Sequence, residues 1–325
     1  MLRYVFRRLL YTIPLLLVAS VVIFAVIHAT VDPGAALGFN PRVRAADIIR
    51  FRKALGLDRS GPAQYFAWLS HFARGDWGIS LANQQAVWPQ IRTALFNTLQ
   101  LGIAAAAFSI FLGVGIGVVS SIRQYSVFDY TSTGAAFLGL SIPTFWFGLI
   151  CQLVLGLYLQ QWLHLSNPIF YTAGQVSPGI TGLALADRAR HLVLPMIVLS
   201  VQFVAVYSRY MRASMLEVLN SDYVRTARAK GLRERRVILH HGMRNAMIPV
   251  TTQIAIDIGS LAAGLVITES IFQWPGMGTL FLDAMEKGDY AIVLPWVIVV
   301  VFSVALMNLL ADVAYAYLDP RVRYA

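Results

Sequence analysis

Asp257 is the ionisable residue whose position in the sequence most strongly suggests a chemical role. It interrupts a run of 23 residues, 246–268, that holds no other Asp, Glu, Lys or Arg. A carboxylate at the centre of a membrane-spanning helix costs about 2.5 to 3.5 kcal/mol on insertion scales unless it faces water or a partner. Together with Gln253, one turn earlier, Asp257 is therefore a candidate lining residue of a polar path, where it would attract an ammonium group. A hydrogen bond to a neighbouring helix is the alternative.

Motifs of covalent or metal chemistry are missing from the sequence. It contains no G-x-x-x-x-G-K-S/T phosphate loop, no H-E-x-x-H pair and no G-x-S-x-G elbow, and Cys151 is its only cysteine. We therefore expect a chain that is not an enzyme, with no catalytic residue, no metal and no cofactor of its own. If ATP drives its function, another subunit must bind and hydrolyse it.

The elements that must position these residues are long apolar helices. Hydrophobic residues make up 58% of the 325 and charged residues only 13%, against roughly 45–50% and about 25% in a soluble domain. Six runs approach or exceed the ~20 residues that a spanning helix needs. The sequence predicts an all-α, polytopic membrane protein with six transmembrane helices. The expected spans are residues 9–31, about 95–119, about 131–159, about 191–212, about 246–270 and about 290–315.

The distribution of Lys and Arg predicts the orientation. Three cations lie in residues 1–8 and nine between Arg209 and Arg244, on the same side if six spans are correct. This predicts an N-in, C-in topology with residues 1–8 and 217–245 in the cytoplasm. The net charge of +10 is then explained by basic residues in the cytoplasmic loops of a membrane protein. No nucleic-acid partner is expected. A re-entrant dip within 160–186, rich in Gln, Gly and Pro, is an alternative left open.

The extracytoplasmic loop, residues 32–92, contains two amphipathic stretches. They read AADIIRFRKALGLD and QYFAWLSHF. Two short helices on the outer membrane surface fit this spacing of apolar residues. A small packed loop domain fits it equally.

The cytoplasmic region after the fourth expected span contains a short basic segment. Ser221 precedes it as a candidate N-terminal cap, Asp222 begins it and Gly231 ends it, which is typical of a capped helix. Small and cationic side chains together suit insertion into a groove on a cytoplasmic partner, although basic residues are expected in any cytoplasmic loop. The residues of this segment are Asp222, Tyr223, Arg225, Thr226, Ala227, Arg228, Ala229, Lys230 and Gly231.

A second loop, between the fifth and sixth expected spans, combines aromatic residues with a tight turn. It reads ESIFQWPGMGTLFLDAMEKGDY, and its Pro-Gly pair demands a turn. The residues themselves favour anchoring of Phe272 and Trp274 at the membrane interface.

Several runs of the sequence resemble the dipeptide and oligopeptide permease subunits of bacterial ABC importers. The runs are RRLLYTIP, LGLD, RGDWGIS, SIPTFWFGL, RHLVLPMIVL, DYVRTARAKGL, RNAMIPV, TESIFQWPGMG and LDPRVR. They are spread over nearly the whole chain. The resemblance identifies residues 93–325 as the ABC permease transmembrane domain, and Arg225 to Gly231 as its coupling helix, with Arg225 standing where many ABC permeases have Glu. It also implies, as the alternative to membrane anchoring, that the loop between the fifth and sixth expected spans contacts a substrate-binding protein. The candidate contact residues are Gln273, Trp274, Pro275, Gly276 and Gly278.

The resemblance implies a heteromeric importer in a bacterial inner membrane. A second homologous permease subunit would complete the translocation path, two ABC ATPase subunits or domains would bind ATP and Mg, and an extracytoplasmic substrate-binding protein would deliver the substrate. Peptides are the expected cargo, and nickel or glutathione are alternatives within the same architecture. An ion-driven secondary transporter is a further alternative, but it would normally carry several intramembrane ionisable residues.

Overall fold

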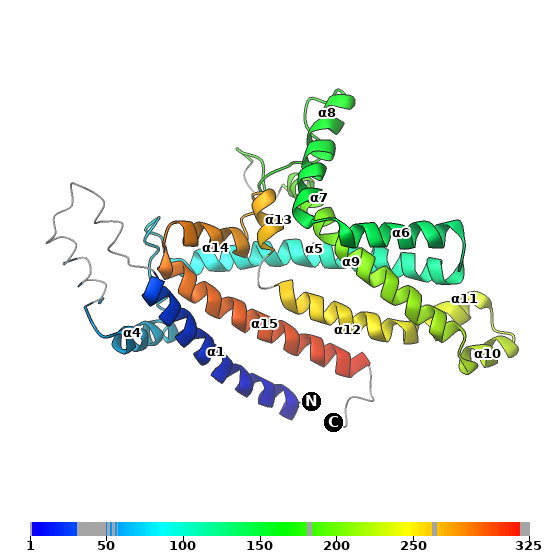
Figure 1. Ribbon diagram of the computed structural model, residues 1–325, viewed down its shortest axis with the longest axis horizontal. Helices are drawn as coiled ribbons and strands as arrows, with labels where there is room; N and C mark the ends of the chain where they lie inside the picture. The colour runs from blue at the N-terminus through cyan, green and yellow to red at the C-terminus, as the bar shows by residue number, and fades with distance from the viewer. Residues whose placement is uncertain are drawn as a thin grey trace.

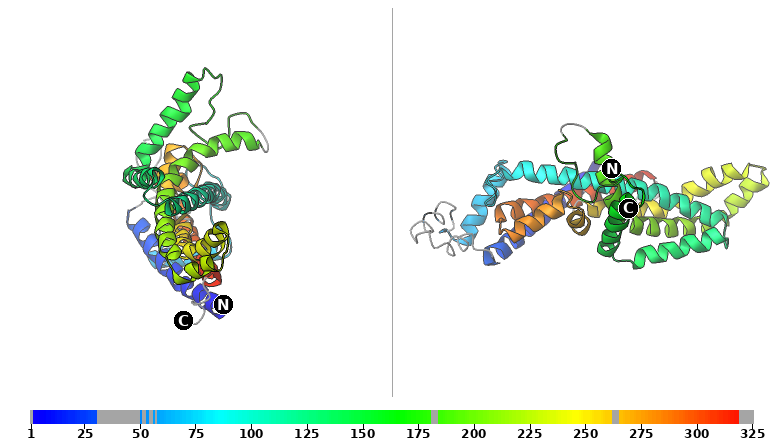
Figure 2. Two further views of the ribbon diagram at one scale, coloured as in Figure 1. Left: turned by 90° about the vertical axis from the view of Figure 1, so that its right-hand side faces the viewer. Right: turned by 90° about the horizontal axis from the view of Figure 1, so that it is seen from above.

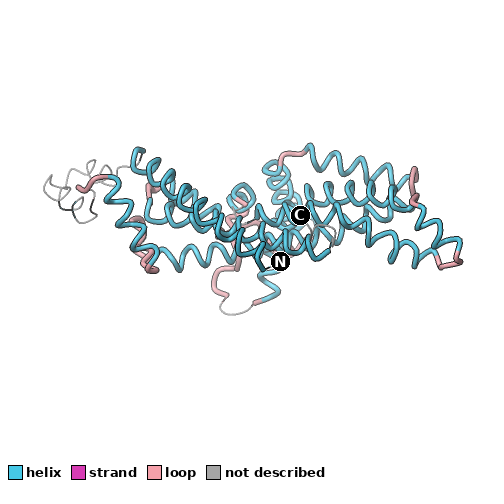
Figure 3. The backbone as a smooth tube through the Cα atoms, turned by 90° about the horizontal axis from the view of Figure 1, so that it is seen from below, coloured by secondary structure: helices cyan, strands magenta, loops and turns pink. Residues whose placement is uncertain are grey.

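In the computed structural model, residues 2–30, 50, 53, 56, 58–180, 184–261 and 265–318 are described. These residues form helices joined by turns, and their only β contact is an isolated bridge between Ile79 and Ala86. Figure 3 shows the same composition along the backbone. The expectation of an all-α fold is confirmed.

The described helices follow the chain in a simple order. They are α1 (Leu2–Thr30), α4 (Gly61–Ala73), α5 (Val87–Ile122), α6 (Val127–Ser141), α7 (Thr144–Cys151), η1 (Gln152–Tyr158), α8 (Leu159–Trp162), α9 (Leu185–Leu219), α10 (Asp222–Ala229), α11 (Glu234–Arg236), η2 (Val237–Gly242), α12 (Met243–Leu261), α13 (Val266–Ile271), α14 (Met277–Glu286) and α15 (Tyr290–Leu318).

The molecule is elongated, and its long helices run along the long axis (Figure 1). The pairs α5 and α9, α12 and α15, and α1 and α15 pack against each other. α10 and α11 lie at one end, and α4 lies at the other (Figure 1). The basic segment, in α10, and α4 are therefore far apart (Figure 1), as they must be if they lie on opposite sides of a membrane.

Five described helical segments are long and apolar enough to cross a membrane. They are Leu10–Thr30, Val87–Ile122, Thr144–Trp162, Leu185–Leu219 and Tyr290–Leu310. α12, which covers most of the fifth expected span, is not among them, and its side chains are described only as far as Ile258. The count of six and the N-in, C-in orientation stay predictions.

The third expected span, residues 131–159, is not one helix in the structure. α6 ends at Ser141, and Ile142 takes an extended conformation with φ −79° and ψ 126° before Pro143. A proline ring disfavours helical geometry in the residue before it and cannot donate a hydrogen bond. α7, η1 and α8 then leave the bundle at a steep angle to α6 (Figures 1 and 2).

Close helix packing holds the centre of the molecule together. At Gly117 an added Cβ would come within 2.6 Å of the Ser208 carbonyl oxygen, and at Gly113 within 3.2 Å of that of Val204. The two glycines lie four residues apart on α5 and let α9 approach closely. The last third of α5 is thereby fixed against α9.

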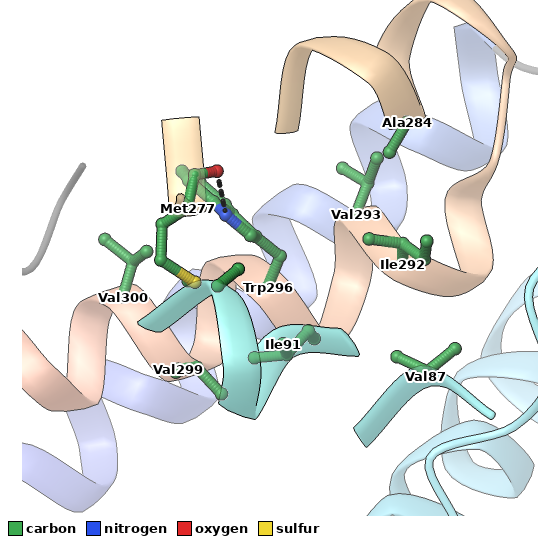
Figure 4. Close-up of a cluster of buried hydrophobic side chains, with 10 residues drawn as sticks. Val87, Ile91, Met277, Ala284, Ile292, Val293, Trp296, Val299 and Val300 are labelled. Atoms are coloured by element: carbon green, nitrogen blue, oxygen red, sulfur yellow. Dashed lines mark hydrogen bonds between the residues drawn. The ribbon is translucent and has the colours of Figure 1, made fainter. Parts of the chain in front are cut away.

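A second apolar cluster joins the start of α5 to α14 and α15 (Figure 4). Its large members are Ile91, Met277 and Trp296, and the Trp296 indole donates a 2.8 Å hydrogen bond to the Met277 carbonyl. This cluster lies near the end of the molecule that carries α4 (Figure 1).

Two sequence predictions fall partly outside the described residues. They concern the amphipathic stretch AADIIRFRKALGLD and the closing run LDPRVR, most of whose residues are not described. The second amphipathic stretch, QYFAWLSHF, lies within α4.

Candidate functional site

The basic segment forms α10, whose inner face packs on its own chain. Val224 and Ala227 are buried against Val237 of η2. Val218 and Leu219, in the last turn of α9, pack against the same cluster. α10 is therefore attached to the end of α9 and the start of η2 by a small apolar contact.

The outer face of α10 carries the polar and charged side chains. Its exposed residues are Asp222, Tyr223, Arg225, Thr226, Arg228, Ala229 and Lys230. The sequence suggested that Ala227, Ala229 and Gly231 would all let a partner approach, and for Ala227 this is wrong, because its side chain faces inward. The Tyr223 hydroxyl accepts a 2.8 Å hydrogen bond from the Asn245 side chain on α12.

Gly231 ends α10 as expected. Its φ is +75°, a left-handed conformation that favours glycine. Its N–H donates to the Arg228 carbonyl at 2.9 Å, and the Leu232 N–H donates to the Ala227 carbonyl at 3.4 Å, the bond pattern of a Schellman cap. The expected cap at the other end is wrong: the Ser221 hydroxyl donates back to the Val218 carbonyl at 2.5 Å.

An exposed ion pair connects α10 to α11. Arg228 Nη2 lies 2.8 Å from Glu234 Oε1, and the two side chains are 41% and 55% exposed. The Arg228 hydrogen bonds lower the pKa of the Glu234 carboxyl. Arg228 is thus oriented toward α11, while Arg225 and Lys230 keep their charges at the surface.

An ion pair that the sequence did not indicate, between a buried carboxylate and a partly exposed guanidinium, lies about two turns before the end of α9. Arg212 of α9 donates to both carboxylate oxygens of Asp129 on α6, from Nε at 2.6 Å and from Nη2 at 2.7 Å. The Ser120 hydroxyl and the Tyr125 N–H also donate to this carboxylate. The pair therefore ties α9 to the turn between α5 and α6.

Asp257 faces a neighbouring helix of the same chain. Its carboxylate accepts a 3.0 Å hydrogen bond from Gln253 on the same helix and a hydrogen bond from the Tyr207 hydroxyl on α9. These contacts are what the hydrogen-bonding interpretation expects. A role of Asp257 and Gln253 in a polar path stays a prediction.

The loop between α13 and α14 buries its aromatic side chains and is hydrogen-bonded to α5. The side chains of Phe272 and Trp274 are 1% and 0% exposed, so anchoring of these rings at a membrane interface is wrong. The Trp274 indole donates to the Asn97 carbonyl of α5 at 3.0 Å, and the Asn97 amide donates to the Pro275 carbonyl at 2.8 Å. Of the five candidate contact residues, Gln273 and Pro275 are exposed, whereas Trp274, Gly276 and Gly278 are buried.

Glu269, which was not predicted from the sequence as a functional residue, holds this loop in place through hydrogen bonds. Its side chain is fully buried. The carboxylate accepts hydrogen bonds from Thr98 Oγ1 at 2.6 Å, from the Gly278 N–H at 2.6 Å and from the Thr279 N–H at 3.3 Å. The last two groups belong to the first turn of α14, where free N–H groups and the helix dipole favour an anion. A glutamate at the end of an apolar run was the available signal.

A further loop joins the same cluster. The Gly174 N–H donates to the Phe272 carbonyl at 2.8 Å. The Gln175 amide donates to Asn97 Oδ1 at 3.1 Å and to Gln100 Oε1 at 2.9 Å. Two loops distant in sequence are therefore held on one stretch of α5.

Comparison with known proteins places the chain in a defined group. Residues 109–324 match the family described as "Binding-protein-dependent transport system inner membrane component", and residues 1–102 match the N-terminal family of the same systems. The oligopeptide transport system permease protein AppB of Bacillus subtilis is 38% identical over 322 residues, 99% of each chain. The dipeptide transport system permease protein DppB of Escherichia coli K12 is 35% identical over 340 residues, 100% of this chain and 99% of that one.

Two further comparisons concern a relative with another cargo and a solved structure. The glutathione transport system permease protein GsiC of Pectobacterium atrosepticum is 35% identical over 324 residues, 100% of both chains. An inward-facing structure of the MetNI methionine ABC transporter is similar with a TM-score of 0.53 and 14% identity, covering 70% of this chain and 96% of that one. The latter likeness shows a shared membrane-domain fold.

Proposed function

The chain belongs to the family of binding-protein-dependent transport system inner membrane components, and from this membership we propose that it is the permease subunit of an ATP-driven peptide importer. It forms half of the translocation path in a bacterial inner membrane and does no covalent chemistry. The observation that carries the proposal is α10, a short helix at one end of the molecule with an apolar inner face and a charged outer face.

The partners follow from two exposed surfaces of the molecule. ATPase subunits with bound ATP and Mg dock on the exposed face of α10, through Arg225, Thr226 and Lys230. A substrate-binding protein contacts the loop between α13 and α14, where Gln273 and Pro275 are exposed and which Glu269 holds in place. A second permease subunit supplies the other half of the path.

The geometry suggests how movement of α10 reaches the path. α10 packs on Val218 and Leu219 at the end of α9, and α9 is one helix from Leu185 to Leu219. A displacement of α10 therefore tilts α9, which contacts α5 at Gly117 and the turn after α5 through Arg212. Nucleotide binding in the partners biases two arrangements of these helices, and the substrate follows the population shift.

Charge reversal on α10 tests the docking proposal. We expect Arg225→Glu combined with Lys230→Glu to weaken binding of the ATPase subunits by at least about tenfold, because docking of complementary charges is replaced by repulsion. Affinity is measured with the chain in nanodiscs, and thermal stability is measured in parallel. The matched control is Lys287→Glu, an exposed cation at the end of α14. Equal affinity for both variants, at unchanged stability, excludes α10 as the docking site.

The cargo is tested separately by uptake. We expect reconstituted importer to take up labelled di- to pentapeptides, with unlabelled peptides competing and neither nickel nor glutathione competing at the same concentration. Competition by nickel or glutathione alone replaces the peptide assignment, while leaving the ATPase docking result untouched.

Asp257→Asn tests whether the carboxylate recognises a peptide ammonium. Because Tyr207 and Gln253 already hold the carboxylate, we expect uptake of peptides with free and with acetylated N-termini to fall by the same factor. A loss confined to peptides with a free N-terminus instead identifies Asp257 as a lining residue of the path.

A further inference from the structure

Helix α4 contacts α1 well below the end of that helix. The Tyr65 hydroxyl and the Ser20 hydroxyl lie 2.8 Å apart, and the Tyr65 ring packs edge-on against Phe24, with centroids 5.4 Å apart. Ser20 precedes Thr30, the last residue of α1, by ten positions (30 − 20), about 15 Å at 1.5 Å per helical residue. α4 therefore does not rest on top of α1 but lies alongside it.

The contact lies within a segment that is apolar enough to cross a bilayer. That segment is Leu10–Thr30, and Ser20 is near its midpoint. Among the α1 side chains that the structure describes from Leu10 onward, Ser20 is the only buried one. Outside its contact with α15, the exposed surface of α1 must face acyl chains or another apolar partner. α4 begins beside the end of α1, since a Cβ at Gly61 would lie 3.6 Å from the His28 ring.

The composition of α4 suits the same environment. Its 13 residues, GPAQYFAWLSHFA, include no Asp, Glu, Lys or Arg. Tyr65 is its only buried residue, and Phe66 beside it is 65% exposed. The exposed residues of α4 are Pro62, Ala63, Phe66, His71 and Ala73. At helical spacing Pro62, Ala63, Phe66 and Ala73 form one exposed apolar stripe, whereas His71 lies on another face, where its ring nitrogen is 2.9 Å from Asp76. A soluble loop helix would normally place charged side chains on such a face.

Aromatic rings continue from α4 to the start of α5. Trp68 and Phe72 have centroids 5.5 Å apart, Phe72 and Trp77 4.6 Å, and Trp77 and Trp88 4.4 Å. Trp and Tyr concentrate at the boundary between lipid and water, where an apolar ring meets polar headgroups. Charged residues appear at both ends of α4, with Arg59 before it and Arg74 after it, both exposed.

We propose that α4 is an interfacial helix embedded in the leaflet at which α1 ends, with lipid covering its exposed stripe. Tyr65 reaches inward to Ser20, which leaves the α4 backbone roughly 5 to 10 Å below the headgroup boundary, the depth typical of interfacial helices. Phe66 contacts acyl chains, and Arg59 and Arg74 lie at the level of the lipid phosphates. The inference depends on α1 crossing a bilayer, not on the transport activity.

Spin-label accessibility tests the depth of α4. Single cysteines at Phe66 and, as a control, at the exposed loop residue Ala82 are labelled in a Cys151→Ala background. The full chain is reconstituted in nanodiscs of phosphatidylethanolamine and phosphatidylglycerol. We expect the ratio of oxygen to nickel-chelate accessibility to be on the order of tenfold higher at 66 than at 82, because oxygen concentrates in acyl chains and the chelate is excluded from them.

Each other outcome overturns the proposal. High nickel-chelate accessibility at position 66 places α4 in water. Low accessibility to both reagents at position 66 shows that protein covers it. A second label at Ala63, on the same exposed stripe, guards against local disruption by the Phe66 substitution, and it must give the same ranking against position 82.

Discussion

Two buried carboxylates, Asp129 and Glu269, hold helices at opposite ends of α5, and different chemistry stabilises each. Asp129 binds Arg212 through two hydrogen bonds and also accepts from Ser120 near the end of α5. Glu269 accepts from Thr98 near the start of α5 and from backbone N–H groups of α14. One site uses a guanidinium, and the other uses a helix N-terminus.

The difference follows from what each site can reach. The Arg212 side chain is 28% exposed. It is long enough to reach from the molecular surface to the buried Asp129 carboxylate. Glu269 is fully buried in the loop cluster, where a second full charge would itself need desolvation. Backbone N–H groups already present at the start of α14 satisfy the carboxylate without that cost. The contact between α9 and α6 thus carries an ion pair, and the loop between α13 and α14 carries a carboxylate that caps a helix.

Removal of the Glu269 side chain is expected to have the largest effect. Glu269→Ala leaves Thr98 and two N–H groups without their acceptor in a buried site, at a cost of about 3 to 5 kcal/mol in the free energy of unfolding. Unfolding in detergent micelles measures it, with the exposed Glu286→Ala as control. Glu269→Gln retains the shape and one acceptor oxygen, and it should lose less. Equal damage from both variants would show that the negative charge, rather than the hydrogen bonds, is what α14 requires.

Breaking the ion pair is expected to cost somewhat less. Arg212→Met leaves Asp129 buried without its cation and should cost about 3 kcal/mol, whereas Asp129→Ala leaves a partly exposed arginine that reaches water and should cost about 2 kcal/mol. The double variant should be more stable than the sum of the two losses predicts, because it leaves no unpaired charge. Additive losses would mean that Ser120 and Tyr125, not Arg212, hold Asp129.

The contact between α5 and α9 lies between the two carboxylates. Disturbing it is expected to cause a third, smaller loss of stability. Gly117→Ala forces a Cβ to within 2.6 Å of the Ser208 carbonyl and of the Met211 Cβ, and such overpacking costs about 1 to 3 kcal/mol. Gly115→Ala is the matched control: an added Cβ there meets nothing within 4 Å, and alanine's higher helix propensity should stabilise by about 0.5 to 1 kcal/mol. A loss at both positions would assign the effect to backbone flexibility instead of packing.

These two carboxylates also show how far the sequence could be read. Long apolar runs predicted most helices, and Gly231 predicted the end of α10, because both signals are local. Asp129 and Arg212 are 83 positions apart, and Thr98 and Glu269 are 171 apart. No periodicity links such residues; only the packed fold brings them together. The break at Ile142 was signalled by Pro143 but was outweighed by the apolar run around it.

The smallest effect is expected at Arg228 and Glu234, the exposed counterpart of the Asp129 pair. Both side chains reach water, so the pair should contribute only about 0.3 to 0.5 kcal/mol. The hydrogen bonds from Arg228 lower the pKa of Glu234 from its ordinary value of 4.5. A carboxyl whose pKa is lowered by folding adds stability above its unfolded pKa and loses it as the pH falls through the folded one. Glu234→Gln should therefore be slightly less stable than the parent at pH 7, and the difference should shrink as the pH falls below the ordinary value of 4.5 and vanish below the lowered, folded pKa. Thermal unfolding of both at several pH values measures this, with the exposed Glu286→Gln as control. A difference above about 1 kcal/mol, or one that persists at low pH, would show that exposure to water does not set the strength of guanidinium and carboxylate pairs in this molecule.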